Sequence, residues 1–525
     1  MGVLRAAVLV AGALTSACAT DAGFDVLIRG GRLLDGSGNP WRRVDIGVEA
    51  DRIVAVGDLG DDPDAARAAL VIDASGLIVT PGFIDVHSHA AAALATAELS
   101  DARPLLMQGI TTVVVNPDGS GPTDLPAQRR ALLADGLGVN VALMVPHAGV
   151  RQAVLGMEDR APNAEELRAM EELVRSGMEE GAFGLSSGPF YAPGSFATTE
   201  ELIALARVAA AAGGVYSSHI RDEADYSVGV IAAVEEVIRI AEEADLPGVV
   251  THVKVLGPRV WGLSRTIVEL VERARARGVE VYADQYPYEA SGTGIVGALV
   301  PRWAQEGGHP ALLARLREAE QRARIRAEVV DNLDRRGGAD RLLFARYPAD
   351  PSIEGRTLSA IAEERGAHPA DLALDLLGGG DAGLISFNMT EDDIAVFMRR
   401  PWTMTASDGG LTAPGEGHPH PRWYGTFPRK IRRYALEDGV VGLEDAVRSM
   451  TSLSAGVFGM ADRGVVRSGA IADLVIFDLE RIRDAATYED PHRLAEGVEW
   501  VLVGGEVAVA GGEPTGRLAG RVLSR

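Results

Sequence analysis

Between residues 80 and 410 the sequence alternates apolar, β-branched runs with helical stretches, and this alternation constrains the fold more than any other feature. The strand-like runs include ITTVVVN, VNVALMV, AFGLSS, GVYSSHI, GVVTHVKV, VEVYADQYPY and WTMTASDG. The helical stretches include residues 164–180, 199–212, 227–244 and 264–278. Strands that alternate with helices predict a parallel sheet, and their number predicts an α/β fold of the (β/α)8 TIM-like barrel type.

The two ends of the chain carry a different pattern. Residues 24–79 alternate apolar and polar residues between Gly and Asp turns, and residues 464–479 and 498–517 repeat this pattern. Such alternation is typical of short strands. We therefore expect a small β-sandwich domain formed by residues 23–80 and 463–525, attached to the barrel at 81–462. Residues from about 300 to 400 are more charged, and they predict a helical insertion before the last barrel strand.

The net charge of −23 argues against nucleic acid as a partner, because a phosphate backbone attracts a surplus of Lys and Arg. The negative charge also argues against binding to anionic membrane surfaces. No run after the N-terminal region is long and apolar enough for an integral membrane span. We expect a small-molecule substrate. The sequence leaves open whether the protein forms a homo-oligomer.

Residues 1–22 predict an export signal. MGVLR carries one Arg, AAVLVAGALTSA is a short apolar run, and small residues follow in ACATDA. The only cysteine, Cys18, lies here, so the segment is either a lipoprotein signal with a lipid anchor at Cys18 or a signal cleaved nearby. A plain N-terminal helix is the remaining alternative. We expect an exported protein, periplasmic or secreted.

Two histidines close the strand-like run TPGFIDVHSHA. Side chains two residues apart on a strand face the same side, so His87 and His89 are expected to point into the barrel mouth. His219, His252 and Asp408 also follow strand-like runs. A single histidine at a strand end is commonly a core residue, but this set indicates a site for one or two metal ions with an open position for water.

These motifs resemble the amidohydrolase superfamily, and within it the N-acyl-D-amino-acid deacylase (D-aminoacylase) family. The resemblance covers nearly all of the chain after residue 22. It is carried by PGFIDVHSH, GITTVVV, GLSSGPFYAPG, SSHIRDE, THVK, DQYPY, SDG, HPHPRWYGTFPR and MTSLSAGVFGMADRGVVRSGAIADLVIFD. It implies a barrel with a small β-sandwich built from both chain ends. The metal ligands that it implies are His87, His89, His219, His252 and Asp408.

The sequence departs from the family pattern at Asp118. The family has a cysteine ligand in a GNCG turn, where this chain has VVVNPDGSG. A carboxylate is also short and anionic, so Asp118 is expected to ligate or bridge the metal; the alternative is a turn residue in an Asp-Gly pair. Because a carboxylate is a harder donor than a thiolate, Mn²⁺, Co²⁺ and Fe²⁺ stay candidates beside Zn²⁺.

The expected chemistry is hydrolysis of an amide by metal-activated water. A bound metal lowers the pKa of water to about 7 and polarises a carbonyl oxygen. Asp408 is the expected catalytic proton shuttle, a role that the resemblance also implies. The expected substrates are N-acyl-D-amino acids or short peptides with a bond to a D-residue. Their D-configuration rests on the resemblance alone.

The substrate carboxylate needs a cation and hydrogen-bond donors. Lys254 follows His252 by two residues and is expected to face the same mouth. Arg221 in HIRDE either orients the substrate or forms a structural salt bridge. The resemblance adds Tyr191, Tyr286, Tyr288 and Ser291 as candidates, and the spacing of Tyr286 and Tyr288 lets one of them alone point into the site.

Two other functions stay open at this stage. One is a dipeptidase or a cyclic-amide hydrolase of the hydantoinase or dihydropyrimidinase kind, on the same scaffold. The cyclic-amide group usually has a carboxylated lysine between two metals, and Lys254 fits the role of binding a carboxylate better. The other is a non-catalytic metal-binding or ligand-binding relative.

Overall fold

A computed structural model describes residues 23–525, and its centre is a closed barrel of eight parallel strands. The strands are β6 (Phe83–Asp85), β7 (Ile110–Val115), β8 (Asn140–Leu143) continued by β9 (Val145–Pro146), β10 (Gly184–Ser187), β11 (Val215–Ser218), β12 (Gly248–Val250), β13 (Val281–Gln285) and β17 (Thr403–Thr405). A parallel bridge between Ser88 and Gly409 closes the ring between the first and last strands. The predicted (β/α)8 barrel is confirmed.

Helices surround the barrel, and their sequences show why they form. In α5, Asn163 caps the first turn and Glu166 completes a capping box, so the backbone N–H groups at the helix start are paired. Strand β7, ITTVVV, is buried along its whole length, as β-branched residues are in a parallel sheet covered on both faces. The helices of the barrel are α1 (Ala91–Leu94), α2 (Arg103–Leu106), α3 (Leu125–Leu133), α4 (His147–Leu155), α5 (Ala164–Glu179), α6 (Thr199–Ala211), α7 (Val230–Ala244), α8 (Ser264–Ala276), α14 (Glu391–Met398), α15 (Arg422–Arg429), α16 (Leu443–Met450) and α17 (Ser452–Phe458).

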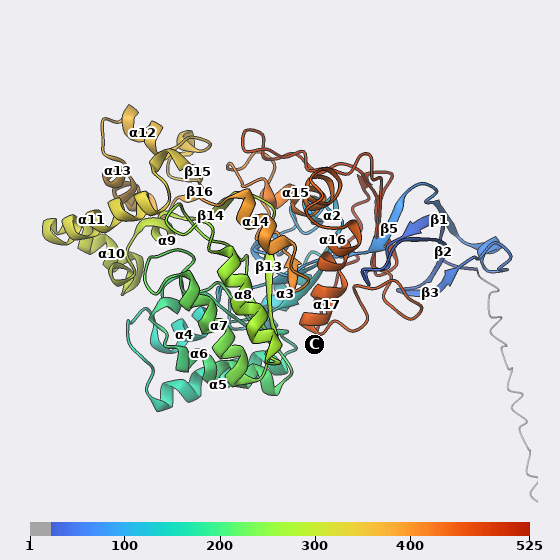
Figure 1. Cartoon of the computed structure of the whole chain (residues 1–525), viewed down its shortest axis with the longest axis horizontal. Helices are drawn as coiled ribbons and strands as arrows, with labels where there is room; N and C mark the ends of the chain where they lie inside the picture. Colours follow the sequence, from blue (N-terminus) through green and yellow to red (C-terminus); the bar gives the residue numbers. More distant parts are fainter. Residues whose placement is uncertain (1–22) are drawn as a thin grey trace, which may run out of the picture.

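Strands from the N-terminal and C-terminal parts of the described chain form one nine-stranded sheet at one end of the molecule, whereas the C-terminus itself returns to the barrel beside α17 (Figure 1). Its strands are β1 (Val26–Leu33), β2 (Arg42–Glu49), β3 (Arg52–Gly57), β4 (Leu70–Asp73), β5 (Ile78–Pro81), β18 (Leu474–Phe477), β19 (Val498–Val503), β20 (Glu506–Ala510) and β21 (Glu513–Pro514). The two ends join where β5 pairs antiparallel with β18. The alternating patterns at the two ends of the sequence therefore belong to one sheet.

A second body of chain projects from the opposite end of the barrel, between β13 and β17 (Figure 1). It has its own apolar core, which includes Leu299, Phe344 and Leu358. Its elements are β14 (Ala290–Gly294), α9 (Ile295–Leu299), α10 (Gly308–Arg317), α11 (Ala319–Arg335), β15 (Leu342–Arg346), α12 (Leu358–Glu364), α13 (Pro369–Leu376) and β16 (Gly383–Phe387). This insertion was predicted as helical, and it also holds the antiparallel sheet β14-β16-β15, which the sequence pattern did not reveal.

The predicted export signal at residues 1–22, with Cys18, lies outside the described residues. Within residues 23–525, no helix has both the length and the apolar character needed to cross a membrane.

Candidate metal centre

Asp118 lies at the centre of four imidazoles at the carboxyl ends of the barrel strands. Its carboxylate oxygens are 3.3 Å from His87 Nε2, 3.4 Å from His89 Nε2, 3.7 Å from His219 Nδ1 and 3.5 Å from His252 Nε2. These five side chains come from four segments, since His87 and His89 share one, and the barrel brings their polar atoms into one cluster. Asp118 is therefore placed among the histidines.

Asp408 forms the second carboxylate of this cluster. Its Oδ1 is 3.1 Å from His89 Nε2 and 3.7 Å from His87 Nε2. Its Oδ2 is 3.0 Å from Nη1 of Arg422. Asp408 thus stands between the imidazoles and a buried guanidinium.

Several polar atoms of this cluster are buried without a hydrogen-bond partner among the described residues. They are both ring nitrogens of His87 and of His219, and Oδ1 of Asp118. An unpaired buried polar atom costs about 1–3 kcal/mol. Because several such atoms lie together here, a bound ligand that pairs with them would remove this cost. Imidazole nitrogens and carboxylate oxygens are donors for divalent transition ions, and these residues therefore fit a metal ion.

The donors form two groups whose ligand atoms within each group lie no more than 4.8 Å apart. The first group is His87, Asp118, His252 and Asp408, and the second is His219, Glu223 and His252. Each group has the three or four ligands that a catalytic ion takes from a protein. The arrangement can accommodate one ion or two.

The electrostatics of the cluster favour a cation. Burial opposes ionisation of Asp118 and Asp408, yet the neighbouring imidazoles, and Arg422 in the case of Asp408, hold both pKa values well below the usual range. Burial also works against a charged His89, but hydrogen bonds to the two carboxylates raise its pKa to about 9. The carboxylates therefore stay ionised and attract positive charge, either protons or a metal ion that displaces them.

The backbone at the cluster adopts conformations that L-residues seldom take. Asp118, His252 and Asp408 have φ values of +57°, +35° and +47°. Such strain persists only where surrounding contacts impose it, and it concentrates at functional sites. One such contact is Asp284 Oδ1, which accepts a 2.5 Å hydrogen bond from the backbone N–H of His252.

A further buried carboxylate, Asp85, fixes the segment that carries Asp408. It accepts hydrogen bonds from the backbone N–H and the hydroxyl of Ser407, at 2.9 and 2.5 Å. Its other close contact is the backbone N–H of His87, at 3.3 Å. Burial raises the pKa of Asp85 to about 6 despite these bonds. Asp85 thus ties the first and last barrel strands together beside the cluster.

Sequence reasoning missed two charged residues of the centre. Glu223 lies 3.2 Å from His252 Nδ1 and 3.6 Å from His219 Nε2, and its Oε1 accepts a 2.6 Å hydrogen bond from Lys254 Nζ. Arg422 pairs with Asp408 as described above. The signal for Glu223 was its place four residues after His219 in SSHIRDE, and the signal for Arg422 was the motif HPHPRWYGTFPR.

Two cavities meet at the cluster. The one we call the polar cavity has a volume of about 270 Å³. Its lining includes His219, Glu223, His252, Lys254, Tyr191, Phe190, Ser291 and Arg336. His89, Asp408, Gly292 and Thr293 also line it, and they line the second cavity as well.

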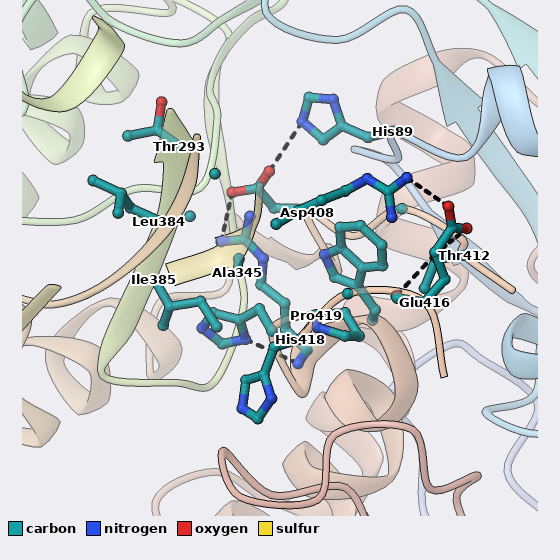
Figure 2. A pocket seen from close by; sticks show the side chains of 18 residues that line it. His89, Thr293, Ala345, Leu384, Ile385, Asp408, Thr412, Glu416, His418 and Pro419 are labelled. Atoms are coloured by element: carbon teal, nitrogen blue, oxygen red, sulfur yellow. Dashed lines mark hydrogen bonds and ion pairs between the residues drawn. The ribbon is translucent and has the colours of Figure 1, made fainter. Parts of the chain in front are cut away.

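The second cavity, which we call the apolar cavity, has a volume of about 310 Å³. Figure 2 shows Leu384 and Ile385 along one side of it, with His89 and Asp408 beside it. Ala345, Pro419 and Trp423 complete much of its wall. A substrate whose reacting bond lies beside Asp408 would therefore extend into the polar cavity on one side and the apolar cavity on the other.

Three of the predicted substrate-binding residues, Lys254, Tyr191 and Ser291, line the polar cavity. Lys254 Nζ is 2.6 Å from both Glu223 Oε1 and His252 Nδ1, so its charge is already paired. The Tyr286 ring packs behind the cavity wall, 5.7 Å from Lys254 Nζ, and its buried hydroxyl has no partner among the described residues.

The structure does not bring Tyr288 and Arg221 to the cavities. Tyr288 turns its hydroxyl to the Pro421 carbonyl at 3.4 Å, and its ring packs on Arg429. Arg221 is a correction to the predicted substrate-binding set. Its guanidinium hydrogen-bonds Glu236 of α7 at 2.7–3.2 Å, which is the structural salt bridge left open above.

Known proteins resemble this chain in both sequence and fold. D-aminoacylase of Alcaligenes xylosoxydans xylosoxydans is 38% identical, over 96% of this chain and 98% of that protein. An N-acyl-D-glutamate deacylase of Bordetella bronchiseptica, solved with zinc and a phosphonate mimic of the tetrahedral intermediate, superposes with a TM-score of 0.81 at 36% identity, covering 96% of this chain and all of that one. A D-hydantoinase, at 17% identity and a TM-score of 0.58, shares the fold alone. Because residues 70–509 also match the model of the amidohydrolase family, this chain belongs to that family.

Proposed function

We propose that this protein is a metal-dependent hydrolase that deacylates N-acyl-D-amino acids. The observation that carries the proposal is the convergence of four imidazoles and two carboxylates, with orphaned ligand atoms, where two cavities meet. The nature of the substrate rests on the relatives, a D-aminoacylase and an N-acyl-D-glutamate deacylase.

The proposed metal ligands are His87, His89, Asp118, His219, His252 and Asp408. When bound, a divalent ion would lower the pKa of water to about 7 and polarise the amide carbonyl. The relative solved with zinc favours Zn²⁺, and the carboxylate of Asp118 also suits Mn²⁺, Co²⁺ or Fe²⁺. Glu223, which lies beside His219 and His252, is a candidate to complete the second donor group.

Asp408 is the proposed catalytic proton shuttle. Its Oδ1 faces the imidazoles and takes the proton of the attacking water, and it then returns that proton to the leaving amine nitrogen. The Arg422 guanidinium, 3.0 Å from Oδ2, holds the carboxylate in this orientation. The same contact favours the ionised form that accepts a proton.

The two cavities suggest the orientation of the substrate. The amino-acid part carries a carboxylate and suits the polar cavity, where Lys254 lies beside the ligand His252. The acyl part suits the apolar cavity beside Leu384 and Ile385. The scissile amide would then lie next to Asp408, which lines both spaces.

Narrowing the apolar cavity tests this orientation. Ala345 lines it from β15, and its side chain is half-buried, so Ala345→Phe adds a ring without entering the core. We expect kcat/KM for an N-phenylacetyl-D-amino acid to fall about 10-fold, a typical effect of overpacking, while the N-formyl compound is spared. Ala345→Ser is the matched control. Equal loss on both substrates would contradict the assignment.

An assay of paired N-acetyl-D- and N-acetyl-L-amino acids, before and after chelation, tests the proposed function. We expect turnover of the D-series alone, loss with the chelator, and recovery with Zn²⁺. Activity on the L-series only, or indifference to metal removal, would overturn it. Turnover of hydantoin or dihydrouracil would favour a cyclic-amide hydrolase, and bound metal without hydrolysis would favour a non-catalytic relative.

We also propose that the protein is exported, on the basis of the sequence of residues 1–22. Mass spectrometry of the mature chain distinguishes the alternatives. Cleavage before Cys18 with an added lipid mass indicates a lipoprotein, and cleavage nearby without that mass indicates a periplasmic or secreted protein.

A further inference from the structure

Arg336 is a buried cation in the wall of the polar cavity, and the proposed chemistry does not use it. It directly follows α11 in the insertion, and its side chain is 1% exposed. Its Nε donates to the hydroxyl of Tyr226 at 2.7 Å and to the carbonyl of Ala298 at 3.2 Å, and its Nη1 donates to the Ser386 hydroxyl at 3.1 Å. All three partners are neutral.

The other three Lys and Arg side chains that line the cavities are neutralised by carboxylates, and one of them, Arg346, pairs with Glu416 at 2.5 Å. Lys254 pairs with Glu223 at 2.6 Å, and Arg422 pairs with Asp408 at 3.0 Å. Within residues 23–525, Arg336 makes no ion pair, and no acceptor hydrogen-bonds its Nη2. A buried charge without a counter-ion is costly, and a guanidinium with free N–H donors is suited to bind a carboxylate.

The position of Arg336 indicates which carboxylate it would meet. From the cluster residue His219, the Phe190 ring lies 5.0 Å away, the Tyr226 ring lies 5.5 Å beyond that, and the Tyr226 hydroxyl contacts Arg336. Lys254, by contrast, directly contacts His252 of the cluster. The α-carboxylate is attached one carbon from the scissile nitrogen and must stay near the cluster, whereas the end of a side chain reaches further.

We propose that Arg336 binds the side-chain carboxylate of the substrate, so that the enzyme prefers N-acyl derivatives of acidic amino acids such as glutamate. This proposal rests on the proposed deacylase function. Tyr226, Ala298 and Ser386 belong to three different segments and fix the guanidinium before the substrate arrives. A fixed planar fork matches the two oxygens of a carboxylate and loses little freedom on binding.

The test compares N-acetyl-D-glutamate with its neutral isostere N-acetyl-D-glutamine, in the wild type, Arg336→Gln and Arg336→Lys, all loaded with Zn²⁺. We expect the wild type to favour the glutamate compound by at least about 10-fold in kcat/KM, since hydrogen bonds to charged groups are worth that much. We expect Arg336→Gln to remove this preference while turnover of the glutamine compound stays within about 3-fold, because the lost bond is made to the glutamate side chain alone. Arg336→Lys restores part of it.

Arg335→Gln is the matched control, because Arg335 lies one residue earlier and pairs instead with Asp225 and Asp331. It should leave the preference unchanged. An equal loss on both substrates in Arg336→Gln would assign Arg336 to the α-carboxylate, and an unchanged ratio would leave it no role in binding; either result overturns the proposal.

Failure of the proposed function is a separate outcome. It would appear as a wild type that hydrolyses neither compound. Calorimetric binding of D-glutamate against D-glutamine, in the wild type and in Arg336→Gln, then still tests the proposal. Tighter binding of D-glutamate by the wild type alone supports it, and equal binding in both proteins overturns it.

Discussion

Replacing Asp408 with asparagine is expected to lower kcat/KM about 1,000-fold, within the range of about 100- to 10,000-fold that a general acid–base group contributes. The change keeps the shape of the side chain but removes the group that accepts a proton. Oδ1 of Asp408 is 3.1 Å from His89, and Oδ2 faces Arg422. Asp118 also lies 3.4 Å from His89, but its carboxylate is surrounded by the four imidazoles and is a proposed metal ligand. Steady-state kinetics on an N-acetyl-D-amino acid measures the effect.

Metal analysis of the same Asp408→Asn protein separates proton transfer from metal loss. The first donor group keeps three other members, His87, Asp118 and His252, so the metal content should stay close to that of the wild type. If the variant retains its metal and more than a tenth of its activity, Asp408 is not the shuttle. If it loses the metal, the activity loss reports on the proposed role of Asp408 as a metal ligand, and the shuttle role is then tested by the same assay at saturating Zn²⁺.

Replacing Asp118 with alanine is expected to weaken metal binding by more than about 100-fold, because losing even an outer partner of a ligand commonly costs 10- to 100-fold. Asp118 is the residue that contacts all four histidines, at 3.3–3.7 Å. Without its charge, the site would lose an anionic ligand that offsets the positive charge of the bound cation. Competition with a chromophoric chelator measures the affinity.

Asp118→Asn and Asp118→Cys are the matched variants of this experiment. The asparagine keeps the size but not the charge and should behave like alanine, to within about 10-fold. The cysteine supplies the thiolate found in the family and should retain metal, with a shift in preference toward Zn²⁺ over Mn²⁺ because sulfur is a softer donor. An alanine variant that binds metal as tightly as the wild type would identify Asp118 as a turn residue.

The sequence predicted the barrel, and it also predicted that most of the histidines and carboxylates of the cluster lie together; one physical reason explains both. In a parallel barrel the strand ends share one rim, so His87, His219, His252 and Asp408 could be placed together from their positions after apolar runs. Asp118 could be placed only through the family motif, since it lies in a turn and shares no strand periodicity with the others.

The residues that escaped prediction are positioned by packing between distant segments. Arg336 enters the polar cavity from the insertion, and Arg422 reaches Asp408 from the start of α15. No local pattern specifies where such segments dock. Arg221 is a residue that the sequence placed near the substrate but that the structure places elsewhere. Its motif lies at a strand end, but its side chain pairs with Glu236.

Elemental analysis of the purified protein, together with an anomalous-scattering map from its crystals, tests the proposed metal centre most directly. We expect at least one transition-metal ion per chain, with its strongest peak among His87, Asp118, His252 and Asp408. A protein that binds no metal, or a peak away from these four side chains, would contradict this expectation.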